Sequence, residues 1–409
     1  MTDKKKMFAL VGNFGFKPGP KGLSIYRYDP STAKMEWIET AFEDANVGHQ
    51  STDDEQNIVY LVNERPSLRG QTGGGGYLMA IKIDPLTGKA SLINEKETLS
   101  QEPCYTCLEK SKQYILVSHH ADFGFVTKIV QTEKGYSTKI YFDDTALVLF
   151  PINEDGSLGD ACDVALTPGD GAPGPHTWSR HHSINEDPTG ELYIVCDKGL
   201  DQFHTYHLDR EKGKLVHLKD IDVDFGMAPR YGVYHPTLPY FYANYEKKPV
   251  IDAYRYDVAS GHLECVGSAP LLSLDNEKPD SGMPPVVHPK TLHEVEAIRP
   301  VRVESADIVI HPSGKYIYAS VRGLDMISIL DVDEEGALSL RCEVNCGGIN
   351  PRGLQLSPDS RFLFSANMES GNVTVFSIDA DGMLQLTDAG VDATSPGNIC
   401  VLTTGNQEG

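Results

Sequence analysis

The stretch ADIVIHPSGKYIYASVRGLDMISILDVDEEGALSL, residues 306–340, contains one unit of a pattern that runs through the whole chain. An apolar strand leads into a Pro-Ser-Gly turn, a second apolar strand follows, and a third strand ends at Asp333, just before a turn that contains Gly336. Asp caps such a turn with its own side chain, and Gly takes the positive φ that the turn requires. The stretch therefore predicts short antiparallel strands joined by tight turns.

The hairpin part of this unit occurs seven times, with its capping residue at Asp29, Asp84, Asn153, Asp209, Asp257, Asp333 and Asp379. Several strands in each period of ~40–50 residues are typical of a β-propeller. The C-terminal TSPGNICVL adds a strand without a continuation of its own, so the two termini should complete one blade. We predict an all-β fold, a seven-bladed β-propeller over residues 1–409, in which ring closure leaves no exposed sheet edge.

Two intervals between the repeats are longer than the others, and they contain residues near 121–146 and near 272–298. We expect both to be insertions on a single scaffold rather than separate domains. The run GQTGGGG at 70–76 predicts a flexible loop and not a phosphate-binding loop, because no Gly-Lys-Ser/Thr follows it.

The charge balance narrows the classes of partner. The chain has 36 Lys and Arg against 58 Asp and Glu, a net charge of −22, which disfavours binding to nucleic acid or to anionic membranes. A few converging arginines can still form a pocket for a small anionic molecule. The sequence lacks an apolar run of the ~18–20 residues that a membrane helix needs and lacks a secretory signal. We therefore expect a cytoplasmic protein with reduced cysteines.

The repeat register predicts which residues line the channel. The innermost strand of each blade precedes the turn, and counting back six residues from the turn proline gives His182, Arg230, Ala306 and Arg352. The less regular blades give His49, Tyr105 and Asn398. A second set follows at the ends of the next strands: Glu64, His119, His120, Asp197, Lys198, Asn244, Glu246, Arg322 and Asn367. Such a gathering of ionisable groups predicts an anion-binding catalytic pocket, although Arg352 also fits a role in pinning neighbouring blades.

Histidine and cysteine pairs do not indicate a metal. Neighbouring residues on a strand point to opposite faces, so His119–His120 and His181–His182 can each offer one ligand to a given site. The pairs Cys104/Cys107 and Cys342/Cys346 occupy different repeat positions. We predict neither a metal nor a cofactor.

Four stretches, at 181–209, 228–246, 306–330 and 350–379, resemble the lactonase family of seven-bladed β-propellers. This family contains the bacterial propeller-type 6-phosphogluconolactonases and the fungal 3-carboxy-cis,cis-muconate lactonizing enzyme. The resemblance implies four catalytic residues: His182 in RHHS, Arg230 in APRYG, Glu246 in ANYE and Arg322 in SVRG. The chain departs from the family pattern at Arg180 and Tyr105, where many members have His.

The resemblance implies a lactonase that acts on a small acidic or sugar-derived lactone by metal-independent acid/base chemistry. Either His182 or Glu246 would transfer protons, while Arg230 and Arg322 would hold a carboxylate or phosphate and stabilise the oxyanion. Substrate contacts are expected from Tyr105, His119, His120, Asn244 and Arg352.

Three alternatives stay open at this point. A lactonizing cycloisomerase would use the same residues, with the arginines fixing carboxylates. A metal-dependent propeller lactonase would use Glu64, Asn244 and Asn367 as ligands. A non-catalytic interaction scaffold would have the same fold, because a fold alone does not define a function.

Overall fold

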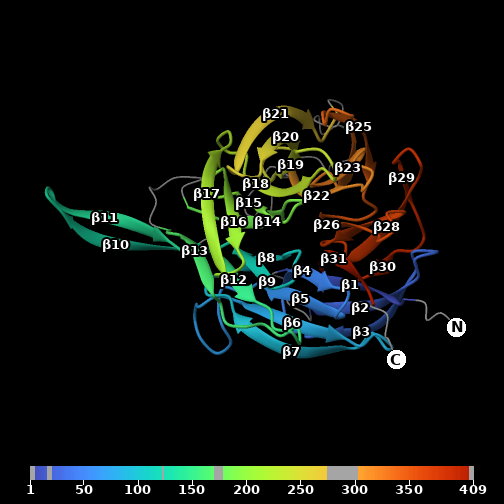
Figure 1. Ribbon diagram of the computed structural model, residues 1–409, viewed down its shortest axis with the longest axis horizontal. Helices are drawn as coiled ribbons and strands as arrows, with labels where there is room; N and C mark the ends of the chain where they lie inside the picture. The colour runs from blue at the N-terminus through green and yellow to red at the C-terminus, as the bar shows by residue number, and fades with distance from the viewer. Residues whose placement is uncertain (1–4, 16–20, 122–123, 170–177, 274–302, 405–409) are drawn as a thin grey trace, which may run out of the picture.

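The computed structural model describes residues 5–15, 21–121, 124–169, 178–273 and 303–404. These residues form seven antiparallel sheets arranged around a central channel, together with a separate two-stranded hairpin (Figure 1). The predicted seven-bladed β-propeller is confirmed. Within these ranges the structure contains no helix with the length and hydropathy needed to cross a membrane.

In each blade the strands follow one another from the channel to the rim. Blade 1 consists of β31 (Pro396–Thr403), β1 (Met7–Asn13), β2 (Gly22–Tyr28) and β3 (Met35–Ala41). Blade 2 consists of β4 (Val47–Asp53), β5 (Ile58–Asn63), β6 (Tyr77–Ile83) and β7 (Ala90–Glu97). Blade 3 consists of β8 (Pro103–Leu108), β9 (Tyr114–His119), β12 (Thr145–Pro151) and β13 (Asp163–Thr167). Blade 4 consists of β14 (His181–Glu186), β15 (Leu192–Asp197), β16 (Gln202–Asp209) and β17 (Lys214–Asp222).

The last three blades follow the same order. Blade 5 consists of β18 (Pro229–Tyr234), β19 (Tyr240–Tyr245), β20 (Val250–Asp257) and β21 (His262–Pro270). Blade 6 consists of β22 (Glu304–Ile310), β23 (Tyr316–Arg322), β24 (Met326–Val332) and β25 (Leu338–Asn345). Blade 7 consists of β26 (Pro351–Leu356), β27 (Phe362–Asn367), β28 (Asn372–Ile378) and β29 (Leu384–Leu386), with β30 (Val391–Asp392) also paired to β28.

The two ends of the chain close the ring. β31 pairs antiparallel with β1, from Met7 opposite Thr403 to Asn13 opposite Pro396, so the C-terminus supplies the innermost strand of blade 1. Each innermost strand contacts the next, in the order β31, β4, β8, β14, β18, β22, β26 and back to β31. The predicted completion of one blade by both termini is therefore confirmed.

The hydrophobic core consists of seven layers, each between two adjacent blades. Between blades 4 and 5, for example, Phe203 packs at 5.9 Å from Phe241, ring centroid to ring centroid. The other six clusters join neighbouring blades in the same way. Because the middle strands are buried on both faces, their sequences are almost continuously apolar. Polar side chains that the core cannot hold are therefore left to the channel and the rims.

Every innermost strand contains a β-bulge at the same level. Pairing with the next strand skips His182 in β14, Arg230 in β18, Arg352 in β26, Cys104 in β8 and Gly397 in β31. The corresponding shifts include Gly48 in β4 and Ala306 in β22. A bulge re-aims one side chain and is common beside active sites. In blades 1, 2 and 3 the sequence count gives the following residue, Asn398, His49 or Tyr105, because these blades lack the regular proline turn.

A hairpin of β10 (Phe125–Thr132) and β11 (Gly135–Phe142) projects from the ring between β9 and β12 (Figure 1, left). It lies within the insertion predicted near 121–146. The insertion predicted near 272–298 lies almost entirely outside the described residues.

Candidate active site at the channel mouth

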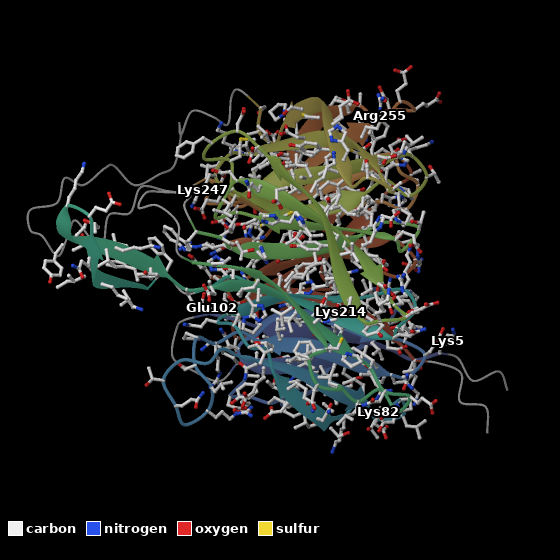
Figure 2. All side chains as sticks on the ribbon, turned by 60° about the vertical axis from the view of Figure 1, so that its left-hand side comes forward. Lys5, Lys82, Glu102, Lys214, Lys247 and Arg255 are labelled. Atoms are coloured by element: carbon white, nitrogen blue, oxygen red, sulfur yellow. The ribbon has the colours of Figure 1, made fainter. Side chains whose placement is uncertain are left out.

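One mouth of the channel collects the predicted catalytic residues. In blades 2 to 5, the residue directly after the second strand donates its backbone N–H to a backbone carbonyl just before the innermost strand of the same blade or at its start. The pairs are Glu64 to Asn46, His120 to Glu102, Lys198 to Arg180 and Glu246 to Ala228. This repeated bond places the four side chains at one level, next to the bulges. Figure 2 shows Glu102 and Lys247, two residues of this edge, on the same side of the ring. We call this edge the mouth.

Glu246 lies at the centre of a cationic group. Its carboxylate oxygens accept hydrogen bonds from Lys198 Nζ, both at 2.9 Å, and Oε2 accepts one from Arg230 Nε at 3.3 Å. Nη2 of Arg322 lies 3.6 Å from the same oxygen. Arg230 is also fixed by a hydrogen bond from Nη1 to the carbonyl of Ala306 in the next blade. Glu246 thus holds side chains of blades 4, 5 and 6 together.

Burial and the surrounding charges set the ionisation of this group. Burial alone would raise the pKa of Glu246, but Lys198, Arg322 and Arg230 outweigh it and hold that pKa well below its usual range. Burial lowers the pKa of Lys198 to about 8, although Glu246 opposes the shift. At neutral pH Glu246 is therefore an ionised and fully engaged carboxylate, which is a poor proton acceptor.

Arg322 has an unused hydrogen-bond donor. Its side chain is largely buried, and its Nη2 lies 3.1 Å from Oε2 of Glu304. Nε has no partner in the described part of the chain, whereas Nη2 is shared between the carboxylates of Glu304 and Glu246. Burial, and then repulsion from Arg230, lowers the pKa of Arg322. A buried guanidinium donor without an acceptor is a place where an anionic oxygen would be bound.

His182 projects from its bulge onto aromatic neighbours. Its ring stands edge-on to Tyr231 at 5.1 Å and to His120 at 5.8 Å, measured between centroids. Nδ1 is buried and has no hydrogen-bond partner. Burial, and then Arg230, holds the pKa of His182 well below its usual value. The imidazole is therefore neutral at pH 7 and able to accept a proton.

Aromatic rings form the floor under His182. Tyr105 stacks on His49 at 3.7 Å and contacts Tyr231 at 5.4 Å, again between centroids. These residues directly follow their bulges, so they lie one level deeper in the channel than His182.

The other residues expected to bind substrate have different surroundings. The guanidinium of Arg352 lies 3.9 Å from the ring centroid of Phe14 at the mouth. His120 also lies at the mouth, with Nδ1 3.5 Å from Oε2 of Glu102. Asn244 is fully buried and bridges two blades, since it accepts from the N–H of Tyr231 at 2.9 Å and donates to Oγ of Ser305 at 2.7 Å.

His119 lies inside blade 3, where Nδ1 donates to the carbonyl of Ala146 at 2.7 Å. The structure brings His182, Arg230, Glu246, Arg322, Arg352, Tyr105 and His120 to the mouth and floor. It does not bring His119 and Asn244 there. Lys198, which the register predicts in the ring without indicating a role, is the closest cation to Glu246.

A buried charge network lies behind the mouth, inside blade 4. The potential ligand atoms of His181, Asp197 and His204 all lie within 4.8 Å of one another. His204, His217 and Asp220 form a second group of this kind, and these two are the groups in the described part of the chain that could hold a metal ion. Both nitrogens of His204 are already engaged, Nε2 to Asp197 at 3.1 Å and Nδ1 to Asp220 at 2.7 Å. We therefore interpret the network as hydrogen-bonded charges within the fold.

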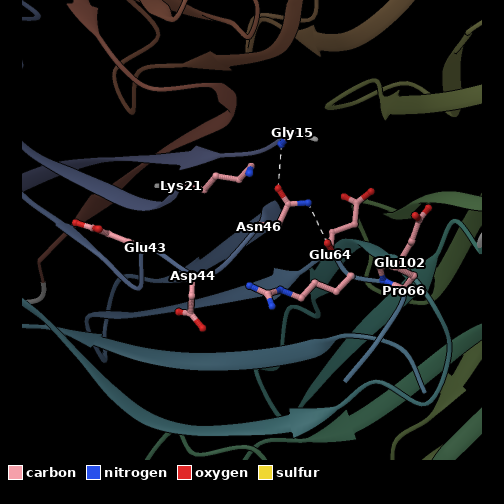
Figure 3. Close-up of a pocket in the computed structure, with 9 residues that line it drawn as sticks. Gly15, Lys21, Glu43, Asp44, Asn46, Glu64, Pro66 and Glu102 are labelled. Atoms are coloured by element: carbon pink, nitrogen blue, oxygen red, sulfur yellow. Dashed lines mark hydrogen bonds between the residues drawn. The ribbon is translucent and has the colours of Figure 1, made fainter. Parts of the chain in front are cut away.

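A pocket of about 380 Å³ opens beside the mouth, between blades 1 and 2 (Figure 3). Glu64 and Glu102 belong both to its wall and to the mouth. Asn46 fixes the backbone here, because its Nδ2 donates to the carbonyl of Glu64 at 2.9 Å and its Oδ1 accepts from the N–H of Gly15 at 2.9 Å.

The model of the family described as "Lactonase, 7-bladed beta-propeller" matches residues 9–403. The chain belongs to the lactonase family of seven-bladed β-propellers. A 6-phosphogluconolactonase of Bacillus subtilis (strain 168) is 23% identical to this lactonase-family chain. The matched region covers 97% of this chain and 98% of the relative. A 6-phosphogluconolactonase of Formosa agariphila is 24% identical over 92% of this chain and 94% of the relative.

Solved structures share the fold of this family member. A Pseudomonas aeruginosa periplasmic gluconolactonase has a TM-score of 0.76 at 19% identity, covering 97% of this chain and 99% of that one. A Bacteroides fragilis protein has a TM-score of 0.75 at 22% identity, covering 98% of both chains.

Proposed function

We propose that the protein hydrolyses the lactone of a small anionic sugar acid, without a metal, at the channel mouth. The class of reaction is supported by membership of the lactonase family and by the relatives named 6-phosphogluconolactonase. The observation that carries the proposal is the group around Glu246, in which Lys198, Arg230 and Arg322 surround one carboxylate.

The local charge supports an anionic substrate. Four cations, the three named above and Lys247, lie around the two carboxylates of Glu246 and Glu304. They leave a positive excess, although the whole chain has a net charge of −22. Buried charges of this kind attract a carboxylate or phosphate far more strongly than exposed ones, because little water screens them. A phosphorylated sugar lactone has this chemistry.

His182 is the proton acceptor in this proposal. It is neutral, its Nδ1 has no partner in the described part of the chain, and the nearby Arg230 disfavours a positive charge on the ring in the resting state. When a water molecule attacks the lactone carbonyl, His182 takes the proton of that water. Glu246 is unsuited to this step because its carboxylate is held by three cations, and it acts by positioning them.

Arginine stabilises the intermediate. Attack on the carbonyl places a negative charge on its oxygen, and donors already fixed in a dry site stabilise that charge without reorganisation. Nε of Arg322 is such a donor, and Arg230 supplies a second guanidinium held by Glu246 and Ala306. One binds the anionic substituent and the other binds the developing oxyanion.

The test is a measurement of proton release on ring opening, with 6-phosphogluconolactone, unphosphorylated sugar lactones and muconolactones as substrates. We expect the highest kcat/KM for the phosphorylated lactone, and an unchanged rate after dialysis against a chelator. Rates no higher than spontaneous hydrolysis for every lactone would overturn the proposal. A preference for muconolactones in either direction would favour the cycloisomerase instead.

A further inference from the structure

Opening a lactone requires a second proton transfer, to the oxygen of the ring that departs. As the carbon–oxygen bond of the ring breaks, the departing oxygen becomes an alkoxide, which leaves poorly unless an acid protonates it. The acid must be protonated at neutral pH and must lie in the same site. Among the described residues of the mouth, Lys198 and Glu64 meet both requirements. The ammonium group of Lys198 is already engaged with Glu246, whereas the carboxyl group of Glu64 has a free oxygen.

The position of Glu64 is set by a glycine. Gly48 lies in the bulge of β4, where blades 4 and 5 carry His182 and Arg230. A Cβ added to Gly48 would overlap Oε2 of Glu64 and lie 3.1 Å from the Cβ of Glu64. The carboxyl group therefore occupies the space that a bulge side chain would take. It reaches the level of the catalytic residues although it comes from the next strand.

The carboxyl group is buried and incompletely bonded. Glu64 is 8% exposed, and its Oε2 has no hydrogen-bond partner. Burial raises the pKa of Glu64 to about 8, even though Arg352, Lys198 and Arg230 act in the opposite direction. The contact with the bulge at Gly48 places the carboxyl group on the channel side. A buried carboxyl group with a free oxygen is held ready to donate to a ligand atom.

We propose that Glu64 is the catalytic acid that protonates the leaving oxygen of the lactone, an inference that rests on the proposed function. Water adds to the carbonyl carbon while His182 takes one proton of that water. The carbon–oxygen bond of the ring then breaks, its electron pair goes to the ring oxygen, and Glu64 gives its proton to that oxygen. The product is a hydroxy acid. His182 afterwards releases its proton to solvent, and Glu64 takes one up.

Glu64 and Glu246 then have different roles in one site: Glu64 is the acid, and Glu246 is the ionised carboxylate that positions the cations. Glu246 is surrounded by cations and stays ionised, whereas Glu64 lies over Gly48 without a direct ion pair. Environments that separate two carboxyl groups in this way are typical of sites that need an acid and a fixed negative charge together.

The experiment compares two leaving groups. Glu64→Gln keeps the size and a hydrogen-bond donor but has no acidic proton, and the substrates are the phosphorylated sugar lactone and an aryl lactone such as dihydrocoumarin. A phenolate leaves without protonation, so only the sugar lactone needs the acid. We expect kcat to fall ~10²–10⁴-fold for the sugar lactone and much less for the aryl lactone. The fall of the wild-type rate at alkaline pH should be smaller in the variant. The part that remains reports Lys198, whose pKa is also about 8 and which acts on Glu64 together with Glu102, Arg352 and Arg230.

Two further variants complete the design. Gly48→Ala keeps the acid but displaces its carboxyl group, so it should lower the rate for the sugar lactone more than for the aryl lactone. Glu55→Gln is the matched control, because Glu55 is an exposed partner of Lys112 outside the mouth and should leave both rates unchanged. Circular dichroism and the melting temperature confirm that each variant is folded.

The outcomes separate the two proposals. A wild type that hydrolyses lactones while Glu64→Gln retains its rate, or loses both substrates equally, overturns the role of Glu64 alone. A wild type that hydrolyses none of the lactones overturns the proposed function together with this inference.

Discussion

His181 and His182 are consecutive in β14, yet they belong to two different kinds of charged network. His181 points into blade 4, where Asp197 accepts from the N–H groups of Arg180 and Gly199, both at 2.8 Å, and from Nε2 of His204 at 3.1 Å. His182 points to the mouth, where Nδ1 of His182, Nε of Arg322 and Oε2 of Glu64 have no partner.

The difference teaches how to separate structural charges from functional ones in this propeller. Around Asp197, the carboxylate accepts from donors of Arg180, Gly199 and His204, so this part of the network stabilises the blade without a ligand. Nδ1 of His181 is the exception, because it is buried without a partner in the described part of the chain. At the mouth, buried donors and acceptors stay unmatched, which costs stability unless a ligand completes them. Breaking the first network should therefore affect unfolding, and breaking the second should affect turnover.

The largest expected effect is on turnover. His182→Ala removes the proton acceptor, and we expect kcat to fall ~10²–10⁴-fold with little change in melting temperature. Initial rates with the phosphorylated lactone and a thermal melt measure the two effects. His119→Ala is the control, because His119 lies inside blade 3 and should leave kcat nearly unchanged. Equal kcat values for both variants would contradict the distinction between structural charges inside the blades and functional charges at the mouth.

Arg230→Lys should follow, with a ~10²–10³-fold loss of kcat. Lys keeps the charge, but one ammonium cannot bond to Glu246 and to the carbonyl of Ala306 in the forked geometry that Arg230 uses. The measurement is steady-state kinetics on folded protein. A loss confined to KM would mean that Arg230 binds substrate without stabilising the intermediate.

Asp197→Asn should destabilise the fold by about 3–5 kcal/mol, because it removes one partner of a buried ion pair. The amide has one acceptor oxygen in place of two. Its NH₂ group therefore faces either the N–H groups of Arg180 and Gly199, which bond to Oδ1 in Asp197, or Nε2 of His204, which bonds to Oδ2. Urea denaturation measures the loss, and kcat per folded molecule should change little. An unchanged denaturation midpoint would show that this network does not stabilise blade 4.

The smallest effect is a pH dependence of stability. Burial would lower the pKa of His204, but Asp197 and Asp220 raise it to about 9. The titratable groups beside it also include His181 and His217. Because the folded pKa lies above the unfolded value, the contribution is complete below about pH 6.5 and is lost as pH rises through about 9. Thermal melts across this window should show a falling midpoint, and His204→Gln should flatten the curve.

The fold could be predicted because every blade repeats the same hairpin and turn, so seven weak signals add up to one architecture. The site was only partly predictable. Counting from the turn located His182, Arg230 and Arg352, whose blades have a regular proline turn. It gave His49 and Tyr105 in place of Gly48 and Cys104, because the position of a bulge depends on pairing and not on turn spacing.

Side-chain contacts between neighbouring blades could not be predicted from the sequence. The contact of Lys198 with Glu246 joins blades 4 and 5, and no spacing within one repeat encodes it. The same holds for Glu64, whose carboxyl group is aimed by the absence of a side chain at Gly48.

The bulges make the mouth of this ring adaptable. A bulge residue does not pair with the next strand, so it can be replaced without changing any hydrogen bond between strands. Each blade therefore has one replaceable bulge position that faces the ligand. Four of these positions carry no charge in this chain: Gly48, Cys104, Ala306 and Gly397. At Gly397 an added Cβ would lie 2.8 Å from the Cβ of Phe14, whereas Ala306 already has its Cβ in place. Ala306, between Arg230 and Arg352 in the ring, is therefore the position from which a protein engineer could redirect this scaffold to a different acid.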